Sequence, residues 1–149
     1  MMEQRLSAGC ILVQEDKVLL VHHYREKEYD FWVMPGGGLK GQEGIFRGAE
    51  REAREETGLL AQAEKIAYIE ELIDEGRYVC KFWVVCRLVS GSLSIAGRDM
   101  DEEYLQGVGF FSQAQVHRMH VYPVILKDLF WRDLQAGFPS IRNLGYMHS

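Results

Sequence analysis

The sequence predicts an α/β fold in which helices cover the faces of a β-sheet. Short apolar runs rich in β-branched and aromatic residues recur along the chain, a pattern typical of strands. Between them lies a proline-free segment dense in Ala, Glu and Arg, which is typical of a helix, and an apolar segment headed by a proline follows near the end. Because the predicted strands and helices interleave, a sheet with helices packed on it is the expected architecture.

Length and charge indicate one globular domain. The chain has 149 residues, of which 47% are hydrophobic and 26% charged, and this length supports one hydrophobic core. We therefore expect a single domain over residues 1–149. The net charge of -5 argues against binding to a nucleic-acid polymer or an anionic membrane, because both require a broad basic surface. No apolar run approaches the roughly 20 residues that a membrane span needs, and no export signal is expected.

The cysteines predict a reducing compartment. Cys10, Cys80 and Cys86 are odd in number and lack the spacing of metal ligands. They are expected to be reduced core residues. This expectation suits the cytoplasm.

The first part of the chain predicts a hairpin, a buried strand and a turn. Residues 7–14 and 18–24 are apolar runs separated by a polar turn, which predicts a hairpin. Residues 31–34 predict a short buried strand. Pro35 and the glycines Gly36–Gly38 cannot continue that strand, so the chain is expected to turn there.

The following segment predicts the first helix, from about Gly44 to Thr57, with Gly58 as a left-handed cap. The second part of the chain predicts further elements in the order of the sequence. These are a hairpin of residues 67–73 and 78–89, a loop over 91–103, a strand over 108–111, a short helix over 113–119, a long helix over 123–134 with Pro123 in its first turn, and a tail over 137–149 with little structure of its own.

Three glutamates share one side of the first predicted helix. At about 100° per residue, Glu52, Glu55 and Glu56 fall within one arc of about 100°. The adjacent arc is expected to face the sheet and carries Ile45, Phe46, Ala49 and Ala53. Neighbouring carboxylates repel one another, so a cation is expected among the glutamates.

Two interpretations of these acids are open. In the first, the acids belong to a solvated helix face with exposed ion pairs of Glu50 with Arg54 and of Arg51 with Glu55. In the second, the exposed backbone N–H and C=O groups of Gly36–Gly38 lie beside the carboxylates, where together they can contact a phosphate and a metal ion. Mg²⁺ and Mn²⁺ prefer oxygen ligands and bridge carboxylates to phosphate oxygens, so the glycines favour the second interpretation.

The segment from Gly37 to Leu59 resembles the complete Nudix box, G-x5-E-x7-R-E-U-x-E-E-x-G-U, in which U is aliphatic. Gly37, Glu43 and the run from Arg51 to Leu59 meet every fixed position. One departure is Gln42, which stands where a glycine is often found. The resemblance implies a Nudix-type α/β/α sandwich with a mixed β-sheet between helices. It also implies hydrolysis of a diphosphate linkage in a nucleoside diphosphate joined to another group, such as a nucleoside triphosphate, a dinucleoside polyphosphate or a nucleotide sugar.

The resemblance further implies a metal site. Glu52, Glu55 and Glu56 would bind Mg²⁺ or Mn²⁺, and a backbone carbonyl within Gly36–Gly38, such as that of Gly37, would be a further ligand. The metal would neutralise the diphosphate and lower the pKa of a bound water.

Other residues are implied to orient the metal ligands or to move a proton. Glu43 and Arg51 would hold the cluster in place, because a guanidinium donates a fork of hydrogen bonds without competing as a ligand. The general base would be a box glutamate or an acid of a later loop. The loop candidates are Asp99, Asp101, Glu102 and Glu103, with Glu102 and Glu103 preferred.

Substrate contacts are less specific in the sequence. Gly36–Gly38, Lys40 and Arg25 are candidates for phosphate contacts. Family members that prefer ADP-ribose tend to have a proline a short distance after the box, and no proline lies between Pro35 and Pro123 here, so the resemblance disfavours that substrate. Nucleoside triphosphates and dinucleoside polyphosphates both stay open. The neighbouring His22 and His23 should point to opposite faces of their strand.

Two further expectations concern binding. One alternative function is a nucleotide-sensing or partner-binding module on the same fold that does not turn over its ligand. The resemblance also makes a homodimer an expectation.

Overall fold

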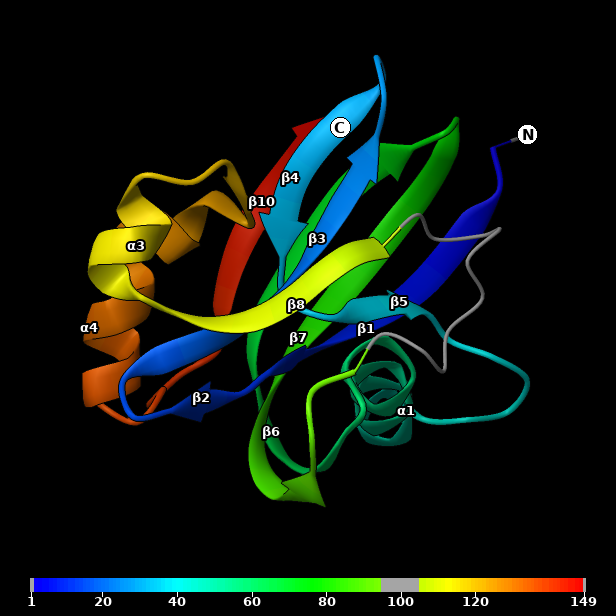
Figure 1. Ribbon diagram of the computed structural model, residues 1–149. Coiled ribbons are helices and arrows are strands. Elements are labelled where there is room, and N and C mark those ends of the chain that lie inside the picture. Colours follow the sequence, from blue (N-terminus) through cyan, green and yellow to red (C-terminus); the bar gives the residue numbers. More distant parts are fainter. Residues whose placement is uncertain (1, 95–104, 149) are drawn as a thin grey trace.

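The computed structural model describes residues 2–94 and 105–148. The predicted α/β class is confirmed: curled, mixed sheets carry helices packed against them (Figure 1). Among the described residues, no helix is both long enough and apolar enough to cross a membrane.

Within the described residues the strands form two sheets. The first contains, in spatial order, β10 (Arg142–His148), β6 (Leu59–Asp74), β7 (Arg77–Gly91), β1 (Gln4–Ile11) and β5 (Gly36–Gly38). The second contains β2 (Val13–Gln14), β3 (Lys17–Arg25), β4 (Tyr29–Val33) and β9 (Val121–Tyr122), with β8 (Leu105–Ser112) paired to β3. Parallel and antiparallel pairs occur in both sheets.

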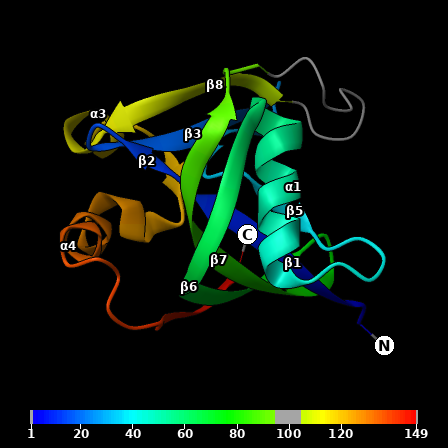
Figure 2. The same ribbon diagram turned by 90° about the horizontal axis from the view of Figure 1, so that it is seen from below.

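The helical elements lie on different sides of the sheets. They are α1 (Ile45–Thr57), α3 (Gln113–His117), the 3₁₀ turn η1 (Val124–Lys127) and α4 (Leu129–Gln135). Figure 2 shows α1 on one side of the β6–β7 hairpin and α4 on the other. The described part of the chain thus has helices on both sides of the first sheet.

Helix α1 begins and ends where the sequence predicts. Its C-terminal cap is Gly58, which has a left-handed φ of 82° and donates its N–H to Arg54. Ala49 and Ala53 are fully buried and belong to the core cluster that includes β1 and β7. Phe46 corrects the predicted buried arc: it is 41% exposed, because it lies at the edge of that arc in the first turn.

Two predictions before α1 need correction. The predicted strand 7–14 is divided after Ile11, and β1 pairs with β5 and β7, so that only β2 forms the hairpin with β3. Gly36–Gly38 form the strand β5, antiparallel to β1, instead of a turn. The glycines fit because Gly36 packs directly on the backbone of Gly9, where a Cβ atom would lie 2.8 Å from the Gly9 Cα.

Two predictions near the C-terminus were also wrong. The predicted long helix is interrupted at Asp128, whose φ of -143° and ψ of -92° are not helical and whose side chain caps α4 by accepting from Leu129. The predicted unstructured tail instead contains β10, which runs parallel to β6. Arg142 in β10 is held by Asp133 of α4 through two hydrogen bonds of 2.8 Å.

The other predicted strands, hairpin and short helix are present, and the predicted loop over 91–103 lies mostly outside the described residues. The hairpin after α1 is the β6–β7 pair, longer than predicted, and β8 and α3 lie over the predicted strand and short helix. All three cysteines are free, and Cys10 and Cys86 are buried.

Candidate active site

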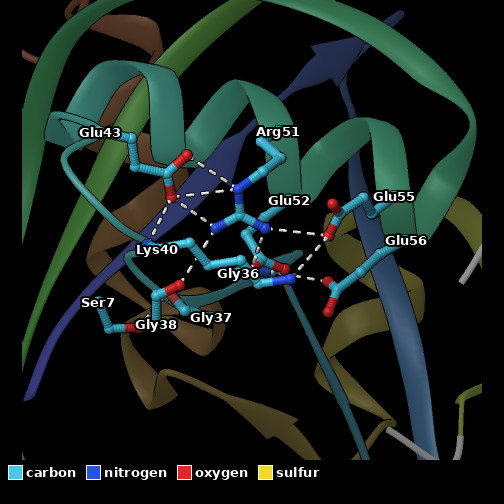
Figure 3. A network of polar contacts seen from close by, with 10 residues as sticks. All are labelled: Ser7, Gly36, Gly37, Gly38, Lys40, Glu43, Arg51, Glu52, Glu55 and Glu56. Carbon is cyan, nitrogen blue, oxygen red and sulfur yellow. Dashed lines mark hydrogen bonds and ion pairs between the residues drawn. The ribbon is translucent and has the colours of Figure 1, made fainter. Parts of the chain in front are cut away.

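Arg51 of α1 is the centre of a polar network between the helix and β5 (Figure 3). Its Nε donates to both carboxylate oxygens of Glu43, at 3.1 and 2.9 Å, and its Nη2 donates to Glu43 Oε1 at 2.6 Å. Its Nη1 donates to Glu52 Oε1 at 3.1 Å and to Glu55 Oε2 at 2.9 Å. The remaining donor reaches the carbonyl of Gly38 at 3.1 Å. One guanidinium therefore joins three carboxylates to β5, hereafter the glycine strand. This guanidinium is a cation among the acids, as the repulsion between neighbouring carboxylates requires.

The charges in this network stabilise one another. Hydrogen bonds from Arg51 lower the pKa of Glu43, and the carboxylate of Glu43 raises the pKa of Arg51 above its usual value. Glu43 is fixed further by the Lys40 backbone N–H, which donates to its Oε1 at 3.0 Å. Through these contacts Glu43 and Arg51 would orient the metal ligands, and that role stays a prediction.

Two of the three glutamates are more deeply buried than the sequence predicts. Glu52 is 3% exposed and Glu56 1% exposed, whereas the helical period places the three glutamates at the border between core and solvent. Glu56 Oε1 accepts from the backbone N–H of Gly36 at 3.0 Å. Buried carboxylates are costly unless they are paired, so their position in α1 needs compensating donors or a cation.

The glycine strand permits this close approach. A Cβ atom on Gly37 would lie 2.6 Å from Glu52 Oε1, so only glycine leaves room for that carboxylate. Gly37 is held in turn by Ser7 of β1, whose hydroxyl donates to the Gly37 carbonyl at 2.7 Å. Ser7 was not singled out in the sequence, because its role depends on a pairing between strands 30 residues apart.

Glu52, Glu55 and Glu56 are hereafter called the carboxylate cluster. Their side-chain oxygens suit a hard divalent cation. They are carboxylate oxygens, a ligand type that Mg²⁺ and Mn²⁺ prefer. In residues 2–94 and 105–148, no three acidic, histidine or cysteine side chains are gathered as a ready metal site. In the cluster, Arg51 Nη1 stands between Glu52 and Glu55 and bridges them as an internal cation.

The structure separates the candidate phosphate contacts. Lys40 is close to the cluster, with its Nζ 4.0 Å from Glu55 Oε2. Arg25 pairs with Glu28 at 3.0 Å near the β3–β4 turn, which Figure 1 places at the opposite end of the molecule from α1. The candidate bases Asp99, Asp101, Glu102 and Glu103 lie outside the described residues.

The two histidines of β3 each stack on an aromatic ring of β4. His22 is stacked on Trp32, with ring centroids 4.6 Å apart, and its Nε2 lies 2.6 Å from Asp30 Oδ1. His23 is stacked on Phe31 at 5.2 Å. Through these contacts both histidines pack against β4 within the second sheet.

Comparison with known proteins gives matches over most of the chain. The NUDIX domain model matches residues 3–127. The chain is 30% identical over 95 residues to an uncharacterized Nudix hydrolase, YvcI, of Bacillus subtilis (strain 168), covering 63% of this chain and 57% of that protein. It is also 30% identical over 98 residues to the 8-oxo-dGDP phosphatase NUDT18 of Mus musculus, covering 66% of this chain and 29% of the mouse protein.

A solved structure supports the same fold. The NUDIX hydrolase from Nitrosomonas europaea superposes with a TM-score of 0.69 at 23% identity, covering 91% of this chain and 90% of that one. The family model, the similar proteins and the fold all indicate the same family. The protein therefore belongs to the Nudix hydrolase family.

Proposed function

We propose that the protein hydrolyses a diphosphate linkage in a nucleotide and that it requires Mg²⁺ or Mn²⁺. The observation that carries the proposal is the position of the carboxylate cluster against a strand made only of glycines, because both the oxygen ligands and the flat backbone are needed to hold a metal and a diphosphate together. Family membership supports the reaction type.

The residues of the site divide into ligands and supports. Glu52, Glu55 and Glu56 would hold the metal, which when bound supplies charge neutralisation at the diphosphate and acidifies a water. Arg51, which Glu43 holds in place, fixes the rotamers of Glu52 and Glu55 through the network described above. Such support raises metal affinity because the ligands need not be ordered on binding.

Phosphate contacts and the general base are assigned next. Lys40, beside Glu55, would bind a substrate phosphate, and backbone groups of Gly36–Gly38 would approach the diphosphate closely. The base that takes a proton from the attacking water would be a glutamate of the cluster, or Glu102 or Glu103.

The substrate class remains that of a nucleoside diphosphate joined to another group. The mouse relative is named as an 8-oxo-dGDP phosphatase, so nucleoside diphosphates belong in the test beside nucleoside triphosphates and dinucleoside polyphosphates. The three free cysteines support a reducing compartment such as the cytoplasm.

The test is product release from a substrate panel, with the parent protein in Mg²⁺, in Mn²⁺ and in EDTA. The panel contains nucleoside diphosphates and triphosphates, sugar nucleotides, dinucleoside polyphosphates and ADP-ribose. We expect turnover of one class with either metal and none in EDTA. Absence of turnover by folded protein that is nevertheless stabilised by a nucleotide would contradict the proposal and support a nucleotide-sensing module instead.

A further inference from the structure

A second group of charged side chains lies on the other face of the glycine strand. The face of the first sheet that packs on α1 carries Ala8 and Cys10 of β1 and Val84 of β7, all in the core cluster of Ala49 and Ala53. Because side chains alternate along a strand, the odd-numbered residues of β1 and β7 point to the opposite face. That face carries Arg5 and Lys81.

Both cations lie across glycines of β5. A Cβ atom on Gly38 would clash with the guanidinium of Arg5, and one on Gly36 would lie 3.2 Å from Cε of Lys81. The intervening Gly37 has the reverse orientation and faces Glu52. The glycine strand is therefore one residue layer thick, with the carboxylate cluster on one face and two cations on the other.

The strand register places the two cations near each other. In the parallel pair of β1 and β7, Ser7 is opposite Lys81 and Arg5 is opposite Val79, so Arg5 and Lys81 are diagonal neighbours on one face. Strand spacing and rise give about 8 Å between their Cα atoms, within reach of two long side chains converging on one anion. Both side chains are partly exposed.

Part of this charge has a structural explanation. The Lys81 ammonium lies 4.3 Å from the ring centroid of Trp83, a cation–π contact. Glu70 is the register partner of Lys81 and accepts from the Trp83 indole at 2.9 Å, so this carboxylate offsets one positive charge. Arg5 adds a second cation to this face, directly beside Gly38, where a Cβ atom would not fit.

We propose that Arg5 and Lys81 bind a phosphate group of the substrate that lies beyond the diphosphate held at the carboxylate cluster. This assignment deepens the proposed function and rests on it. It favours nucleotides with at least three phosphates, because a diphosphate neutralised by metal at the cluster needs no further cations, whereas a longer phosphate chain does. Glycines in the interior of a strand typically mark such a close approach of a ligand to the backbone.

The test measures binding without turnover. Calorimetric titrations in Mg²⁺ use nucleoside triphosphate and diphosphate analogues whose bridging oxygens are replaced by methylene groups. For Arg5→Gln and Lys81→Met, we expect the Kd of the triphosphate analogue to rise about tenfold, as for a lost charged hydrogen bond, and that of the diphosphate analogue to change less than about threefold. Charge-retaining Arg5→Lys and Lys81→Arg should stay near the parent, as should Lys17→Met, a matched lysine at the start of β3.

Two further readouts separate this role from a structural one. The variants should lose part of the salt dependence of triphosphate binding, because they remove charges that salt screens. Thermal stabilisation by Mg²⁺ alone should be unchanged, because the pair lies across β5 from the cluster. Equal losses for both analogues, or parent-like binding by folded Arg5→Gln and Lys81→Met, would overturn the assignment. Binding of the analogues does not depend on hydrolysis, so a failed substrate panel would leave this result readable on its own.

Discussion

Replacing Arg51 by methionine should destabilise the protein strongly in the absence of metal. The Arg51 side chain is 14% exposed, and its partners Glu43 and Glu52 are 17% and 4% exposed. Breaking a buried ion pair from one side costs about 3–5 kcal/mol, because the remaining charge loses its partner. Glu55, which is 36% exposed, adds little, since water screens it. Partial exposure places the expected loss near the low end, at about 3 kcal/mol.

Urea denaturation in EDTA measures this loss, with Arg47→Met as the matched control on the same helix. The Arg47 side chain is 83% exposed and pairs with Glu50 on the same helix, so its replacement should cost less than about 0.5 kcal/mol. In thermal melts the Tm of Arg51→Met should lie about 9 °C below that of the parent, because about 1 kcal/mol of lost stability lowers Tm by about 3 °C in a domain of this size. A loss for Arg51→Met no larger than that of Arg47→Met would refute the view that this guanidinium neutralises the acids.

Two further predictions concern the glycine strand and a distant ion pair. Gly37→Ala should displace Glu52 and weaken Mg²⁺ binding by about tenfold or more, read as a smaller thermal shift with Mg²⁺, whereas Gly44→Ala, whose Cβ would meet nothing within 4 Å, should behave as the parent. Equal thermal shifts would count against the close packing of Gly37. Hydrogen bonds from Arg142 hold the pKa of Asp133 below its usual value, so this pair stabilises the fold above about pH 4 and its contribution is lost as pH falls through the lower folded pKa. Urea titrations from pH 6 to pH 2 should therefore show a shallower decline for Asp133→Asn, and parallel curves would contradict the shift.

Local sequence was sufficient for the helix of the site and for the side of it that carries the three glutamates. The period of 3.6 residues places Glu52, Glu55 and Glu56 on one side of α1, and Gly58 ends the helix as predicted. The helical period does not show how deeply these side chains are buried, however. Glu52 and Glu56 are buried because β5 packs against them, which depends on how far the glycine strand reaches across the helix.

The wrong predictions have two causes: strand pairing between segments far apart in the sequence, and a helix break at Asp128. Glycines disfavour strands locally, yet Gly36–Gly38 form one because β1 offers its edge, and β10 is ordered by its pairing with β6 about 75 residues earlier in the chain. Such contacts leave no periodic signal in either segment. Asp128 is a local signal of the break between η1 and α4, because an aspartate inside an apolar helical pattern often caps a new helix.

The most direct test of the central claim compares Glu56→Gln with Glu50→Gln on the substrate that the panel identifies. Both changes remove one carboxylate charge from α1, but Glu56 faces Gly36, whereas Glu50 accepts from the backbone N–H of Ala63 at 2.8 Å, away from the cluster. If the carboxylate cluster holds the catalytic metal, Mg²⁺-dependent kcat falls at least about a hundredfold in Glu56→Gln and stays within about threefold of the parent in Glu50→Gln. Parent-like turnover by folded Glu56→Gln, or equal losses in the two variants, would contradict the assignment of this site.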